Sequence, residues 1–178
     1  MRLAKKGASH SKSSLQYNLP EEVSKVILKW SKENIPEEEL YTGEEDMGRE
    51  DEIHITVFYG ILDEEPQSTV SILEENNIKP FPVRLSEITA FQDKPEYDVL
   101  KIDIESPELH RIHKLVEKNL DTKNDYPEYI PHLTLAYLKK GYADKYIGNK
   151  DFQGISTIAD TLEFSSKDGS KTDIKLEN

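Results

Sequence analysis

The chain of 178 residues contains no cysteine and only one tryptophan. Without cysteine it can form no disulfide bond, no thiolate metal site and no thiol nucleophile. It also lacks any apolar run near the ~18 residues that a membrane span needs, and its N-terminus lacks the apolar stretch of a signal peptide. These absences predict a cytoplasmic protein without a membrane partner, of a size that fits one domain.

Basic residues are outnumbered by acidic ones, 23 to 35, and the net charge is −12. Because binding to a long nucleic acid requires a basic face, this charge argues against a general binder of DNA or RNA. The acid is concentrated in residues 37–52, which hold nine carboxylates and one base, Arg49. We expect this stretch to be a solvated loop, and a gate against long polyanions is the functional alternative. It lacks the Asp-x-Asp-x-Asp-Gly pattern of a calcium loop.

The remaining pattern predicts alternating helices and strands. We expect a flexible basic tail over residues 1–12 and a single domain over residues 13–178. Apolar spacing predicts helices over 20–34, 68–75 and 107–120, with Trp30 in the core rather than in a binding platform. The expected strands cover residues 13–18, 53–59, 81–91, 97–104, 132–138, 155–164 and 172–176.

One three-residue phrase occurs twice, as His54-Ile-Thr56 and as His132-Leu-Thr134. Each copy lies in a predicted strand, where side chains alternate between the two faces. Histidine and threonine therefore share one face of each strand, and the apolar neighbours share the other. Strict alternation also predicts that Phe58 and Ala136 continue the histidine face and line a cleft. Tyr59 and Tyr137 are expected on the buried side.

Two such pairs facing each other suit the cleavage of a phosphodiester. One neutral histidine can take the proton of the nucleophile, and one cationic histidine can protonate the leaving oxygen. The hydroxyls of Thr56 and Thr134 can donate hydrogen bonds to the non-bridging oxygens. This chemistry needs no metal or other cofactor. The near symmetry of the motifs leaves open which histidine is the acid, and whether water or a ribose 2′-hydroxyl attacks.

The other histidines carry less information. His110 and His113 are three residues apart on the predicted helix 107–120, but a surface position on a charged helix is the commoner reason for such a pair than a metal. His10 falls in the predicted tail, where we expect it to be exposed. The prediction is therefore a site without metal ligands.

The two motifs resemble those of the two-histidine (2H) phosphoesterase superfamily, which carries two His-x-Thr/Ser phrases half a domain apart. The matching stretches are His54-Ile-Thr56 with its Phe-Tyr-Gly close, and Pro131-His132-Leu-Thr134-Leu-Ala. The order of elements over residues 13–176 is also similar. The resemblance implies an α+β, bilobal fold with two antiparallel sheets around a central cleft and helices on the outside. It also implies that His54, Thr56, His132 and Thr134 are catalytic.

Within that superfamily, the acidic charge and the early Ser13-Ser-Leu-Gln-Tyr17 stretch look most like the phage anti-CBASS nucleases. This resemblance implies hydrolysis of the cyclic di- and trinucleotides that serve as alarm signals in bacterial immunity. The expected partner is thus a small cyclic oligonucleotide in the bacterial cytoplasm rather than a long nucleic acid. The oligomeric state is not predicted.

Recognition of a base needs a stacking ring and a polar group that reads the base edge. Tyr17, Phe58 and Phe91 are the candidate rings, and Glu163 is the candidate acceptor for an exocyclic amine.

Two alternatives remain open. The first is an RNA-end enzyme that opens 2′,3′-cyclic phosphates or joins 2′-5′ linkages, with Arg84, Lys139 and Lys140 contributing to a basic groove. The second is a non-catalytic module that binds a cyclic nucleotide and retains binding when either motif histidine is replaced.

Overall fold

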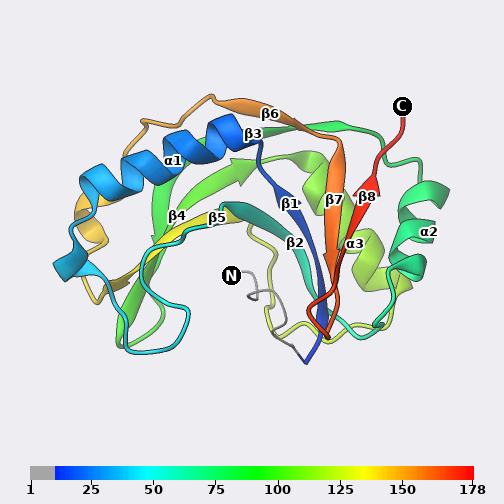
Figure 1. Ribbon diagram of the computed structural model, residues 1–178, viewed down its shortest axis with the longest axis horizontal. Coiled ribbons are helices and arrows are strands. Elements are labelled where there is room, and N and C mark those ends of the chain that lie inside the picture. The colour runs from blue at the N-terminus through cyan, green and yellow to red at the C-terminus, as the bar shows by residue number, and fades with distance from the viewer. Residues whose placement is uncertain (1–10) are drawn as a thin grey trace.

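The computed structural model describes residues 11–178. His10 and most of the predicted tail, residues 1–12, lie outside the described residues. Strands and helices alternate in nearly the predicted order (Figure 1). The helices are α1 (Glu21–Asn34), α2 (Gln67–Glu75) and α3 (Pro107–Asn119), with short 3₁₀ turns η1 (Glu37–Glu39) and η2 (Asp144–Tyr146). The strands are β1 (Ser13–Asn18), β2 (His54–Ile61), β3 (Phe81–Phe91), β4 (Tyr97–Glu105), β5 (His132–Lys139), β6 (Ser156–Ala159), β7 (Thr161–Ser165) and β8 (Lys171–Lys175).

All eight strands form one curved antiparallel sheet in the order β6-β3-β4-β5-β2-β1-β7-β8. The α+β class is confirmed, but the predicted two sheets are two four-stranded halves of a single sheet. The halves meet where β2 and β5 pair through one register position, Ile55 opposite Leu133. This central junction joins the two strands that carry the repeated motif.

The helices cover the two halves separately (Figure 1). Helix α1 contacts β5, and α3 contacts both β2 and α2. Apolar residues at the spacing of one helical stripe form their inner faces, among them Ile27 of α1 and Leu109, Ile112 and Val116 of α3, which are all fully buried. Trp30 is half-buried with its ring edge-on to Phe152, as predicted for a core position.

The segments that precede the two motif strands pair crosswise. The acidic segment before β2 runs along β5, where Glu50 N–H donates to the Leu135 carbonyl and Tyr137 N–H donates to the Gly48 carbonyl. The segment before β5 runs along β2, where Lys123 N–H donates to the Gly60 carbonyl at 2.8 Å. Strands β2 and β5 pair with each other at one position only. These hydrogen bonds provide partners for main-chain groups of both strands beyond that position.

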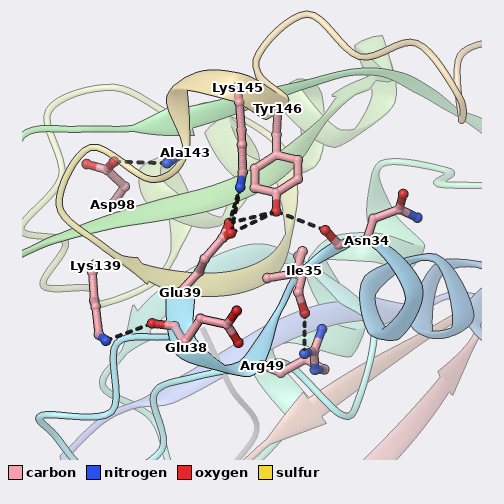
Figure 2. Close-up of polar contacts among 10 residues, drawn as sticks. All are labelled: Asn34, Ile35, Glu38, Glu39, Arg49, Asp98, Lys139, Ala143, Lys145 and Tyr146. Atoms are coloured by element: carbon pink, nitrogen blue, oxygen red, sulfur yellow. Dashed lines mark hydrogen bonds and ion pairs between the residues drawn. The ribbon is translucent and has the colours of Figure 1, made fainter.

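A polar cluster anchors the acidic segment (Figure 2). Glu39 is 3 % exposed and accepts hydrogen bonds from the Tyr146 hydroxyl at 2.9 Å and from Lys145 Nζ at 2.7 Å. Arg49 donates to the carbonyls of Ser31 and Ile35 at the end of α1. The segment is therefore fixed near both ends, and its longest exposed stretch is residues 42–46, which has the exposure expected of a solvated loop.

Candidate active site

The register of β2 against β5 brings the two motifs together. Because Ile55 lies opposite Leu133 in an antiparallel pair, His54 lies opposite Thr134, and Thr56 lies opposite His132. Each histidine thus faces the other motif's threonine, and the two histidines are diagonal neighbours on one face of the sheet.

Both motif strands contain a β-bulge three residues after the histidine. Between β1 and β2 the register shifts so that Val57 has no partner, and between β4 and β5 it shifts so that Leu135 has none. A bulge inserts one residue and reverses the alternation of side chains beyond it. The motif residues precede the bulges, so their shared face is unaffected.

The bulges overturn the sequence prediction for the residues that follow. Phe58 is 1 % exposed with its ring centroid 4.6 Å from that of His113 on α3, and Ala136 is fully buried. Both lie on the helix-covered side, so Phe58 does not line the motif face as predicted. Tyr59 and Tyr137 are half-buried and continue that face instead. The Tyr137 ring packs edge-on against Tyr97 of β4.

His54 is buried, with 6% of its surface exposed, and His132 is partly buried. Burial, together with the proximity of His132, lowers the pKa of His54 to about 3. Burial also lowers the pKa of His132 to about 4. His132 Nδ1–H donates to the Ile130 carbonyl at 2.7 Å, which leaves Nε2 as the free acceptor. The carbonyl of Glu52, two residues before His54, acts in the opposite direction to burial and raises the pKa of the His54 ring. His54 Nδ1 nevertheless makes no hydrogen bond of ordinary geometry.

A lysine and a carboxylate flank His132. Register places Lys101 of β4 opposite Thr134, and Asp103 opposite His132. Lys101 Nζ is hydrogen-bonded to Asp103 Oδ1 and to Thr89 Oγ1 at 2.5 and 2.7 Å. The sequence reasoning missed this trio, although the alternation of Lys101 and Asp103 with buried Leu100, Ile102 and Ile104 was a readable signal.

Phe91 lies where a site ring is expected. Its centroid is 4.9 Å from that of His132 in an edge-on arrangement, and Lys101 Nζ lies 4.4 Å from its centroid. The structure therefore places this predicted base-binding residue beside the second motif.

Another polar group flanks the first motif. Gln16 of β1 pairs with both Thr56 and Glu163, which places Glu163 on the motif face. Glu163 Oε2 accepts from Asn18 Nδ2 at 3.1 Å, while Oε1 is buried without a hydrogen-bond partner and lies 3.9 Å from Lys171 Nζ. Burial raises the pKa of this carboxyl. Glu163 thus has one oxygen without a hydrogen-bond partner, on the strand that is separated from the first motif by β1.

Tyr17 is placed differently from the prediction. The residue is 3 % exposed, and its hydroxyl donates to Thr157 Oγ1 at 3.0 Å, tying β1 to β6 across the curve of the sheet. Its neighbour Gln16 faces the motifs, so Tyr17 points to the opposite side. A stacking role does not fit this placement.

His113 also departs from its expected surface position. It is 8 % exposed, and its Nδ1–H donates to the Val57 carbonyl at 2.8 Å.

Among residues 11–178 there is no cluster of three or more histidine and carboxylate side chains arranged to hold a metal ion. Within the same range, no helix has the length and apolar character to cross a membrane.

The lowered histidine pKa values predict a loss of stability in acid. The unfolded chain takes up protons on these rings near pH 6.5, whereas the folded chain does so only near pH 4 and 3, so the free energy of unfolding falls as pH drops below 6.5. We expect each histidine to cost about 2 kcal/mol at pH 5 relative to pH 7.5. Urea unfolding of the wild type and of His54→Gln at both pH values measures this effect. An equal pH dependence in the two proteins would exclude the assigned cause.

The motif face therefore combines two neutral histidines and two hydroxyls. Lys101 lies beside the second motif, and Lys171 lies beside Glu163. A phosphodiester anion bound between the histidines would favour protonation of one of them, because an opposite charge stabilises the cationic ring. The arrangement can then supply one base, one acid and several donors to the non-bridging oxygens.

Comparison with known proteins agrees with this geometry. The sequence profile of the 2′-5′ RNA ligase superfamily matches residues 33–163, which include both motifs. A similar fold is that of TT0787 of Thermus thermophilus, with 18% sequence identity and a TM-score of 0.61 over 94% of this chain and 98% of that one. The fold of E. coli LigT complexed with NADP+ is also similar, with 16% identity and a TM-score of 0.63 over 94% of this chain and 95% of that one. Kluyveromyces marxianus Usb1 with uridine monophosphate is also similar (12%, 0.59, 93% and 98%). No curated protein sequence matches the chain. Because the profile spans well over half of the sequence, the chain belongs to the 2′-5′ RNA ligase superfamily of 2H phosphoesterases.

Proposed function

We propose that this protein is a metal-independent phosphodiesterase that hydrolyses small cyclic di- or trinucleotides. The observation that carries the proposal is the register at the centre of the sheet, where each motif histidine faces the other motif's threonine. His54 and His132 act as the acid–base pair, and Thr56 and Thr134 donate hydrogen bonds to the non-bridging oxygens. Phe91 and Glu163 are the groups that contact a base.

The charge of the molecule supports a small substrate. The net charge is −12, and among residues 11–178 the lysines beside the motif face are Lys101 near His132, Lys171 near Glu163 and Lys12 over the Tyr59 ring. A few separate lysines can balance a few phosphates but not a long polyanion. In a bacterial host cytoplasm, hydrolysis of such a signal would counter CBASS immunity.

Opening of 2′,3′-cyclic phosphates at RNA ends is the second candidate. Structures similar to this chain include E. coli LigT complexed with 3′-AMP and Usb1 with uridine monophosphate, which are ribonucleotide complexes. Against it, two of the three cations of the predicted basic groove bind groups of the protein itself: Lys139 Nζ donates to the Glu38 carbonyl (Figure 2), and Lys140 Nζ pairs with buried Asp98, while Arg84 is exposed on β3.

A panel of substrates separates the candidates. We expect chelator-treated protein to hydrolyse cyclic di- or trinucleotides faster than 2′,3′-cyclic mononucleotides or RNA with a 2′,3′-cyclic end. Preference for the RNA end would select the second candidate. Binding of a cyclic nucleotide without turnover, unchanged in His132→Ala, would identify a binding module instead.

A further inference from the structure

Tyr129 lies in the segment that leads into the second motif, yet its side chain reaches the first. Its hydroxyl donates a hydrogen bond of 2.9 Å to the main-chain carbonyl of Thr56. The following residue, Ile130, accepts the hydrogen bond from His132 Nδ1–H at 2.7 Å. The neighbouring residues Tyr129 and Ile130 therefore each bind one motif: Tyr129 binds the Thr56 carbonyl, and Ile130 binds the His132 ring.

The Tyr129 ring is fixed on its other side. It stacks on the His113 ring with centroids 4.1 Å apart and an angle of 8° between the planes. His113 in turn donates to the Val57 carbonyl at 2.8 Å. Two adjacent carbonyls at the β2 bulge, those of Thr56 and Val57, are thus bound by side chains outside the sheet.

This arrangement answers a need created by the bulge. A bulge leaves its extra residue out of the ladder and frees main-chain groups that must find other partners. It also increases local twist, so the direction of the Thr56 side chain depends on how the bulge is held.

We propose that Tyr129 is a positioning residue that fixes the two His-x-Thr motifs relative to each other. Its hydroxyl sets the main chain at Thr56, and its main-chain continuity with Ile130 sets the ring of His132. The inference rests on the proposed phosphodiesterase activity for its kinetic consequence. Its structural consequence, a fixed His132 ring, can be measured without any substrate.

The test variant is Tyr129→Phe, which keeps the stacked ring and removes only the hydroxyl. The matched control is Tyr126→Phe in the same segment, because Tyr126 is 71 % exposed and its hydroxyl makes no hydrogen bond within residues 11–178. Nitrogen-15 NMR of the imidazole at pH 7 reports which ring nitrogen carries the proton. We expect one tautomer of His132, with Nδ1 protonated, in the wild type and in Tyr126→Phe. In Tyr129→Phe we expect a mixture of both tautomers.

Kinetics provide the second readout. We expect Tyr129→Phe to lower kcat about tenfold with KM within twofold, since misaligned groups affect the transition state more than binding. In a Thr56→Val background the same change should lower kcat by clearly less than tenfold, because the part of the effect that acts through the Thr56 hydroxyl is then absent and only the part that acts through His132 remains. An unchanged His132 tautomer in Tyr129→Phe would overturn the positioning role, even if the wild type proves to have no phosphodiesterase activity. Inactivity of the wild type with the expected NMR result would instead count against the proposed function alone.

Discussion

Replacement of His132 by alanine is expected to lower kcat/KM for a phosphodiester by about 10³- to 10⁴-fold. The reason is geometric: the Ile130 carbonyl holds Nδ1, so Nε2 is the only ring atom free to exchange a proton with substrate. His54→Ala should have a loss of similar size, because His54 occupies the equivalent position on β2. Steady-state rates with chelator present measure both losses.

Comparison variants make this result specific. Thr56→Ala and Thr134→Ala each remove one hydrogen-bond donor and should cost about 10- to 10²-fold, less than either histidine. The double histidine variant should be little slower than the single ones, since two groups that act as a unit have non-additive effects. Lys114→Ala, on the exposed side of α3, should stay within twofold of the wild type. Near-full activity of both single histidine variants would rule out the mechanism.

A second large effect is expected at Gly60, where alanine should lower the free energy of unfolding by about 3–5 kcal/mol. Gly60 has φ +114°, a backbone conformation that residues with a Cβ atom rarely adopt. An added Cβ would lie 2.2 Å from the carbonyl oxygen of Lys123 and 2.9 Å from its carbonyl carbon. Both are main-chain atoms, so the clash cannot be relieved by rotation of a side chain.

Gly141→Ala is the matched control for this prediction. Gly141 also has a positive φ, +88°, but nothing lies within 4 Å of an added Cβ. It isolates the backbone strain, which should cost about 1–2 kcal/mol. Urea unfolding of the two variants at pH 7.5 compares them directly. If both variants lose the same free energy of unfolding, the main chain of Lys123 does not clash with a Cβ atom at position 60, and the prediction is wrong.

The Gly60 contact also has a consequence for the site. The Lys123 N–H to Gly60 carbonyl bond fixes the segment before β5 to the end of β2, and the same segment continues to Ile130, which holds the His132 ring. Displacing this segment should therefore lower activity as well as stability.

Much of the framework was predictable from periodicity. The strands at residues 13–18 and 81–91 were predicted with their observed bounds, and the start of α3 followed from Ser106-Pro107. The shared face of each motif was also predictable, because alternation holds over three residues. The choice of His54, Thr56, His132 and Thr134 as candidates needed nothing more.

Prediction failed where main-chain irregularity or cross-strand register decides the outcome. Nothing in the composition near Val57 or Leu135 marks a bulge, so Phe58 was assigned to the wrong face. Lys101 enters the site only because β4 pairs with β5 in one particular register. His113 stands at the i+4 position of the stripe of Leu109, Ile112 and Val116, so its burial was predictable from helix periodicity. Its hydrogen bond to the Val57 carbonyl depends on how α3 packs on β2 and was not predictable.

The most direct test of the central claim is the initial rate of cyclic oligonucleotide hydrolysis by the wild-type protein, measured before and after exhaustive treatment with a chelator. His54→Ala/His132→Ala protein serves as the blank in the same assay. The account predicts a rate that the chelator does not change and that the double variant loses. A rate that disappears with the chelator and returns with magnesium, or one that survives in the double variant, would contradict it.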